Sequence, residues 1–168
     1  MRMLDLCCGL GGASSAFKER GWEVVGVDAD EECHPDIRAD LRTLTLQGSY
    51  DLIWASPPCD EFARESMPWC KTGKKPDLSI VEDCRRIIHE LRPRWWVMEN
   101  VKGAVPYLGK CKLAIPPYYF WGEFPMFLWP HRRQIHHKMK TSGMNRRKRA
   151  KIPHDISLAF CLAMEANL

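Results

Sequence analysis

Hydrophobic and polar positions are arranged along the first hundred residues in a way that predicts short strands separated by helices. The apolar runs expected to form buried strands are 2–6, 22–28, 50–54 and 94–98. Residues 13–20 are expected to form a helix that ends before Gly21, and residues 79–91 repeat apolar positions every three to four residues, as an amphipathic helix does. Strands that alternate with helices favour an α/β fold with a parallel sheet.

The remaining segments have less regular patterns. Residues 60–78 contain charges, two prolines and a glycine with little periodicity, so we expect a long mobile loop there. Aromatic residues gather at 118–122 and 126–129, which are expected to be short strands or a base-stacking surface, with most rings packed in the core. A final helix is predicted from Pro153 onwards, with its apolar residues on one face.

Length and composition fit one globular domain that covers residues 1–168, with 45% hydrophobic and 27% charged residues. No apolar run approaches the ~20 residues that a membrane-spanning helix needs. Asp5 lies where a signal peptide would have its apolar core. We therefore expect a cytoplasmic protein that does not associate with membranes.

The eight cysteines contain no CxxC pair, and no histidine pair has zinc-finger spacing. Several of them lie inside apolar runs, where a free cysteine behaves as a small hydrophobic residue. We expect reduced thiols and no bound metal.

The positive charge is concentrated in one segment. Nine Lys or Arg residues and no acidic residue lie between Pro125 and His154, whereas the rest of the chain holds 16 basic against 21 acidic residues. A basic run is often only a solvated surface. The concentration of all the excess charge in one segment nevertheless favours a polyanionic partner such as nucleic acid.

The end of the predicted strand at 50–54 is followed by two prolines and a cysteine. Pro57 and Pro58 cannot donate to a sheet ladder, so the chain is expected to leave the sheet here, with Cys59 just past the carboxyl end of the strand. Ligands bind at that edge in open α/β sheets. Two interpretations stay open at this point: a reactive thiol, or a strand terminator followed by a small buried cysteine.

A glycine-rich turn follows the first predicted strand, and the second strand ends at Asp28. Such a turn lets the backbone approach a ligand closely, although many turns are glycine-rich for steric reasons alone. The spacing from Gly11 to Asp28 is close to the ~20 residues at which a carboxylate meets ribose hydroxyls. We therefore favour ligand binding over a surface role for Asp28. Asp40 and Leu41 follow a further apolar-to-polar switch and could reach the same cleft.

Glu99 follows the predicted strand at 94–98, so it is expected at the same sheet edge as Cys59. A carboxylic acid buried beside an apolar strand has a raised pKa, which suits proton donation. A glutamate that only caps the following turn would have the same pattern, and spacing alone favours neither interpretation.

Taken in order, these motifs resemble the DNA cytosine-5 methyltransferase family. The segment from Asp5 to Gly12 is similar to its first cofactor motif, Pro57-Pro58-Cys59 to its nucleophile motif, and Glu99-Asn100-Val101 to its catalytic glutamate motif. Arg149 to Pro153, with the last helix, is similar to its closing motif. The resemblance implies an α/β, Rossmann-like S-adenosylmethionine-dependent methyltransferase fold with a mostly parallel, doubly wound sheet.

The resemblance also implies a reaction and a set of site residues. Cys59 would add to carbon 6 of a cytosine in DNA, Glu99 would protonate the ring, and carbon 5 would accept the methyl group of S-adenosylmethionine. Arg132 and Arg133 partly match the arginine motif that contacts the target base, so both are catalytic candidates. The residues implied to bind the cofactor are Asp5, Leu6, Gly9, Gly11, Gly12, Asp28, Ala29, Asp40, Leu41 and Pro57. Among them, Asp28 is similar to the family's ribose-binding acid and Asp40 to its acid near the adenine. Those expected to bind nucleic acid are Arg132, Arg133, Lys138, Lys140, Arg146, Arg147, Lys148 and Arg149.

The sequence departs from the family pattern in two main respects. Cys7 takes the place of the aromatic residue in the first motif, which weakens stacking on the adenine ring. Family members carry a separate target-recognition domain between the arginine and closing motifs, whereas this chain has only a short basic remnant at 138–151. Recognition of a DNA sequence is therefore expected to be absent or to come from a partner protein.

Two other classes of function stay open. Ser56-Pro57-Pro58 also resembles the Ser-Pro-Pro-aromatic motif of amino methyltransferases, which would methylate N4 of cytosine without a covalent thiol. Because the recognition domain is missing, the chain could also be a nucleic-acid-binding relative with reduced activity, or could act on RNA or a free nucleotide.

Overall fold

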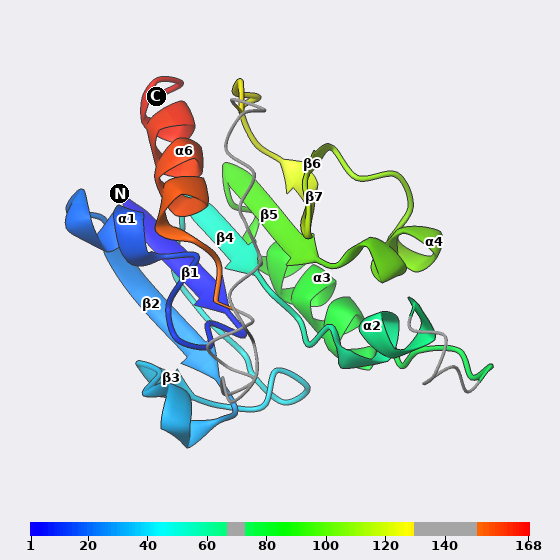
Figure 1. The fold of residues 1–168 in the computed structure, drawn as a ribbon. Coiled ribbons are helices and arrows are strands. Elements are labelled where there is room, and N and C mark those ends of the chain that lie inside the picture. Colours follow the sequence, from blue (N-terminus) through cyan, green and yellow to red (C-terminus); the bar gives the residue numbers. More distant parts are fainter. Residues whose placement is uncertain (67–72, 130–150) are drawn as a thin grey trace.

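The computed structural model describes residues 1–66, 73–129 and 151–168, and within them one seven-stranded sheet forms the centre of the molecule (Figure 1). The strands are β1 (Arg2–Leu6), β2 (Glu23–Asp28), β3 (Ile37–Arg38), β4 (Leu52–Ala55), β5 (Trp95–Asn100), β6 (Leu113–Ile115) and β7 (Tyr118–Glu123). The helices are α1 (Ser15–Glu19), α2 (Asp60–Ser66), α3 (Ser79–Leu91), α4 (Val105–Leu108) and α6 (His154–Glu165), with short 3-10 turns η1 (Glu31–Cys33) and η2 (Lys102–Ala104).

The spatial order of the sheet is β3-β2-β1-β4-β5-β7-β6. All neighbours from β3 to β5 are parallel, whereas β7 runs antiparallel to both β5 and β6. Because β1, β4 and β5 are parallel and adjacent, the segments that follow Leu6, Ala55 and Asn100 all leave the sheet at one edge. The order of the strands along the chain also reverses between β1 and β4. Open α/β sheets bind ligands at such a switch point.

Helices cover both faces of the sheet. On one face, Phe17 of α1 and Phe160 of α6 pack with Trp54 of β4, and the rings of Trp54 and Phe160 lie 4.8 Å apart. On the other face, Cys84 and Ile87 of α3 belong to the second buried cluster. The two separate cores confirm the predicted doubly wound, mostly parallel architecture.

The last helix packs against the first, so the two ends of the chain lie together (Figure 1). The buried hydroxyl of Ser157 donates a hydrogen bond to the carbonyl of Ala13 (2.5 Å) and accepts one from the amide of Ala16 (3.1 Å). At the far end of α6, Glu165 accepts a hydrogen bond from the Trp22 indole (3.1 Å) and pairs with Arg20. α6 is thereby fixed beside the turn that leads into α1.

Most predicted elements are confirmed, with small shifts of their ends. The helix expected at 79–91 has those bounds, and the segment at 118–122 is a buried strand, as core packing requires. At 126–129 the structure has no strand, and Phe127 and Trp129 pack against the core while Leu128 is 99% exposed. The strands β3 and β6 were not predicted, because two or three residues carry too little pattern.

The prediction of a continuous loop over 60–78 is wrong, because α2 occupies its first seven residues. The amide of Ala63 donates to the carbonyl of Cys59 (2.8 Å), and Phe62 is buried against the second core. A helix of seven residues whose apolar positions are only Phe62 and Ala63 leaves almost no periodic signal in the sequence. Among the described residues, no helix is long and apolar enough to cross a bilayer.

Candidate active site

Cys59 stands between the end of β4 and the start of α2. The amide of Ser56 continues the ladder by donating to the Leu6 carbonyl (3.0 Å), and the chain then leaves the sheet through Pro57 and Pro58. Cys59 is half-buried and carries no disulfide. The sequence placed this thiol just past the carboxyl end of a strand, and that placement is confirmed.

Glu99 lies on the neighbouring strand β5, next to the turn that carries the thiol. Ala55 of β4 pairs with Met98 of β5, so the residues that follow them, Ser56 and Glu99, lie side by side at the edge. Burial raises the pKa of Glu99 to about 8, against a smaller lowering by its hydrogen bond with Ser56. The carboxyl group is enclosed although the residue keeps some exposed surface. At neutral pH Glu99 is therefore mostly a protonated acid that can donate a hydrogen bond or a proton.

Asn100 connects the two segments directly. Its buried side-chain amide donates to the carbonyl of Pro57 (3.0 Å), and its side-chain oxygen accepts from the amide of Val101 (2.9 Å). The turn before Cys59 and the end of β5 are thus held to each other. Sequence reasoning gave Asn100 no role of its own, although its place beside Glu99 in the matched motif was a usable signal.

Tyr118 begins β7 at the edge of the sheet where β5 ends, close enough to Glu99 to feel its charge. Burial, and to a smaller degree the charge of Glu99, raise the pKa of Tyr118 to about 12. Its hydroxyl donates to the carbonyl of Lys151 (3.4 Å), which precedes α6. The segment before the last helix therefore reaches the same edge of the sheet as Glu99.

Hydrogen bonds of the Asp28 carboxylate join the glycine-rich turn after β1 to the end of β2. One carboxylate oxygen of Asp28 accepts from the amide of Gly9 and the other from the amide of Asp30, both at 2.9 Å. Each oxygen keeps further acceptor capacity for a ligand hydroxyl. Gly9 and Gly11 both adopt positive φ angles, of 51° and 65°, which glycine alone adopts without strain.

Gly12 is required for a different reason, because the segment before α6 passes directly over it. A Cβ atom at this position would lie 2.6 Å from the backbone nitrogen of Ile152. Only glycine allows this approach, so the first turn and the closing segment form one structure.

Asp5 is a fully buried carboxyl on β1, on the face covered by α1 and α6. Burial raises its pKa to about 7, and smaller effects of Ser14 and Lys18 oppose that rise. Neither carboxyl oxygen has a hydrogen-bond partner in good geometry among the described residues. An unsatisfied buried acceptor beside a glycine turn fits a site that binds a polar ligand.

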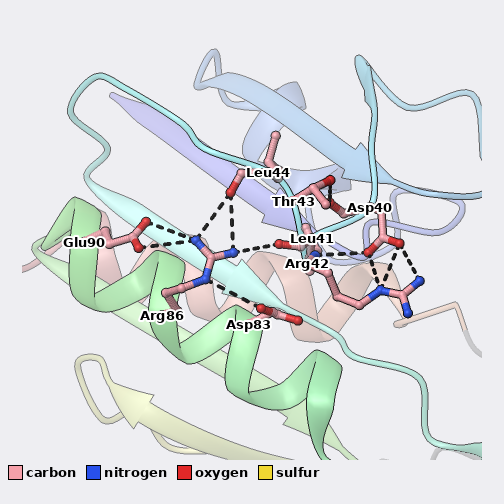
Figure 2. Close-up of polar contacts among 8 residues, drawn as sticks. All are labelled: Asp40, Leu41, Arg42, Thr43, Leu44, Asp83, Arg86 and Glu90. Carbon is pink, nitrogen blue, oxygen red and sulfur yellow. Dashed lines mark hydrogen bonds and ion pairs between the residues drawn. The ribbon is translucent and has the colours of Figure 1, made fainter.

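Asp40 and Leu41 lie in the segment between β3 and β4, outside any strand or helix. Leu41 is buried, whereas Asp40 is half-buried and binds the side chain of Arg42 through both oxygens (Figure 2). Hydrogen bonds from Arg42 lower the pKa of Asp40.

The other predicted cofactor residues lie at the same edge as these groups: Leu6 ends β1, Ala29 follows β2 and is exposed, and Pro57 follows β4 and is buried.

All the residues predicted to contact DNA lie outside the described residues, namely Arg132, Arg133, Lys138, Lys140, Arg146, Arg147, Lys148 and Arg149. Within the described part of the chain, no group of three or more His, Cys, Asp or Glu side chains could hold a metal ion.

Comparison with known proteins then assigns the family. Residues 1–110, which include both Cys59 and Glu99, match the family model of the C-5 cytosine-specific DNA methylases. The chain belongs to this family. The family assignment confirms the predicted resemblance and agrees with the methyltransferase fold class inferred from the motif order.

Individual relatives are similar to this member of the family over part of its length. It is 32% identical over 145 residues to the protein named "Probable DNA (cytosine-5)-methyltransferase" of Frog virus 3, which covers 78% of this chain and 60% of the viral protein. It is 29% identical to the type II methyltransferase M.HindV of Haemophilus influenzae over 61% of this chain and 38% of that protein. It is also 29% identical to M.HgiGI of Herpetosiphon aurantiacus, over 62% of this chain and 93% of that protein. The chain thus spans less than two thirds of the length of the first two relatives.

Proposed function

We propose that this chain transfers a methyl group from S-adenosylmethionine to carbon 5 of cytosine in DNA through a covalent adduct with Cys59. The observation that carries the proposal is the pairing of two adjacent strand ends. One leads into the turn with Cys59, the other carries the protonated carboxyl of Glu99, and Asn100 bonds them together.

The proposed chemistry follows from the low reactivity of carbon 5. Addition of the Cys59 thiolate to carbon 6 forms a sulfur–carbon bond and pushes electron density through the ring, making carbon 5 nucleophilic. Glu99 donates its proton at ring nitrogen 3 and so neutralises the charge that develops there. After methyl transfer, a base removes the carbon-5 proton, the thiolate departs and the proton on nitrogen 3 returns to Glu99, which restores the aromatic ring. The bound cofactor supplies an electrophilic methyl group on a sulfonium.

The glycine turn and its neighbours fit this cofactor. Asp28 would accept hydrogen bonds from the ribose hydroxyls, and Asp40 with Leu41 would contact the adenine. The orphaned carboxyl of Asp5 would complement the positive charge of the methionine part. Leu6, Ala29 and Pro57, with the glycines of the turn, would line the rest of the site.

DNA is the proposed substrate, and the basic segment is the proposed phosphate-binding region. Its nine Lys and Arg residues would give salt-sensitive binding that depends little on sequence. A base in a duplex must leave the stack before the thiol can reach it, at a cost of about a few kcal/mol. We propose that a partner protein supplies sequence recognition, with residues 138–151 in place of a recognition domain. A cytoplasmic location would keep the nucleophilic thiol reduced.

Two substitutions test the proposed roles in a methyl-transfer assay with tritiated cofactor and DNA. We expect Cys59→Ser and Glu99→Gln each to lower the rate at least about a hundredfold, because each removes a group that acts in the transition state. Digestion of the product should yield 5-methylcytosine. A near-normal rate for either variant would remove that residue from the mechanism, and N4-methylcytosine in the product would replace the covalent mechanism with direct amino methylation.

A further inference from the structure

The segment that carries Asp40 and Leu41 has little regular backbone hydrogen bonding. Residues 39–51 connect β3 to β4 without a strand or helix. The amide of Ala39 bonds to the Asp28 carbonyl (3.0 Å), and that of Thr43 bonds locally to the Asp40 carbonyl (3.2 Å). Leu41 is buried in the core, and Leu44 packs partly against it. The amide of Arg42 also donates to the Asp40 carboxylate (3.0 Å), so local bonds hold the turn at Asp40. Side-chain contacts from another element add to them and bind the carbonyls of Leu41 and Leu44.

Those contacts come from Arg86 on α3, which lies along the segment (Figure 2). Its guanidinium donates to the carbonyl of Leu41 at 2.7 Å and to that of Leu44 at 3.4 Å. Arg86 thereby joins the start of the segment to α3, whereas at its far end the guanidinium of Arg2 donates to the carbonyl of Ser49 (3.2 Å).

Two carboxylates on the same helix orient the guanidinium of Arg86. Asp83, three residues before Arg86, lies 3.5 Å from its Nε atom, and Glu90, four residues after it, lies 3.2 Å from Nη1. Both spacings place the side chains on the same helical face as Arg86. Asp83 and Glu90 thus bind two edges of the Arg86 guanidinium, and its remaining donors point at the segment (Figure 2).

Only an arginine at position 86 can make all of these contacts. A guanidinium presents five N–H donors in a rigid plane, so it can bond two carbonyls and two carboxylates at once. A lysine ammonium is a point charge on a flexible chain, and glutamine offers two donors only. Arg86 itself is half-buried, which shields these bonds in part from water.

We infer that Arg86 is a positioning residue that holds residues 40–44 in the shape needed to receive the adenine part of the cofactor. This inference rests on the proposed function, because it assumes that Asp40 and Leu41 face the adenine. Arg86 contacts the backbone of the segment and acts through it. Loss of its bonds should weaken cofactor binding while leaving the chemical step near Cys59 unchanged.

The test measures binding of S-adenosylhomocysteine to the full chain by calorimetry. We expect Arg86→Gln to weaken binding about tenfold, and Arg86→Lys to weaken it by a smaller factor. The matched control is Arg85→Gln, which removes an exposed ion pair with Glu82 on the same helix and should leave the affinity unchanged. In the transfer assay, Arg86→Gln should raise KM for the cofactor while kcat stays within about twofold.

A double-mutant cycle separates positioning from general stability. If Arg86 acts through Asp40, the loss caused by Arg86→Gln should shrink severalfold in an Asp40→Ala background. Full additivity, or an unchanged affinity in Arg86→Gln, would overturn the inference while leaving the proposed function intact. A wild-type chain that binds no cofactor would overturn both. Should Arg86→Gln fail to fold, Arg86→Lys decides the question, since an affinity equal to that of the wild type contradicts the positioning role.

Discussion

At the residue scale, the site depends on side chains whose chemistry is set by their surroundings. Burial, opposed by a smaller effect of Ser56, raises the pKa of Glu99 to about 8, so a residue that is normally an anion becomes an acid at neutral pH. Asp5 is raised to about 7 by the same effect. The sequence could suggest that Glu99 is buried beside an apolar strand, and the structure supplies the enclosure that makes it an acid.

The raised pKa of Glu99 predicts a pH-dependent stability. Below about pH 4.5 both the folded and unfolded states are protonated, and the stabilisation is fully present. Between about 4.5 and 8 the unfolded state releases its proton while the folded state keeps it, so the free energy of unfolding falls as the pH rises. Glu99→Gln stays neutral throughout and removes this part of the slope.

Chemical unfolding at several pH values measures the effect. Relative to wild type, Glu99→Gln should gain about 1–3 kcal/mol of stability between pH 4 and pH 8. Stability profiles that run parallel over this range would show that Glu99 ionises normally in the folded protein. The transfer rate of the wild type should fall above about pH 8, as the acid loses its proton.

At the scale of elements, the packing of α6 on the turn before α1 is what closes the molecule around the glycine turn. Ser157 is the polar centre of this contact, since its buried hydroxyl satisfies the carbonyl of Ala13 and the amide of Ala16. The closing segment also passes over Gly12 at a distance that excludes any side chain there.

We expect Ser157→Ala to lower the free energy of unfolding by about 1–3 kcal/mol, because it leaves a buried donor and a buried acceptor unpaired. The control is Ser15→Ala, which removes a hydroxyl that donates to the Gly12 carbonyl (2.9 Å) at a half-buried position, and it should cost about 0.5 kcal/mol. Thermal or chemical unfolding compares the two variants. Equal losses would mean that the α1–α6 contact does not depend on Ser157.

Elements with a strong apolar pattern were predictable, and those held by distant contacts were not. The pattern at 79–91 gave α3 its correct bounds, since four buried residues recur at helical spacing. α2 has only seven residues, of which Phe62 is the one large apolar residue, and β3 has two, so neither produces a pattern. The role of Arg86 was also beyond prediction, because its partners lie 42 and 45 residues away in the sequence.

At the scale of the whole molecule, one sheet edge gathers groups that are far apart in the chain. The turn after β1 and the ends of β2, β4 and β5 meet there, and Tyr118 links β7 to the segment before α6. The parallel order of the strands makes this convergence a consequence of the fold. The motif order in the sequence was enough to predict it, because each motif follows a predicted strand.

The central claim is that Cys59 attacks a cytosine in DNA, and covalent trapping on an oligonucleotide with 5-fluorocytosine tests it most directly. Fluorine at carbon 5 cannot leave as a proton does, so the adduct persists once the methyl group has been transferred. With S-adenosylmethionine present, the wild-type chain should form a stable complex that survives denaturing gel electrophoresis, and Cys59→Ser should form none. Failure of the wild type to form the complex, or an adduct that persists in Cys59→Ser, would contradict the account.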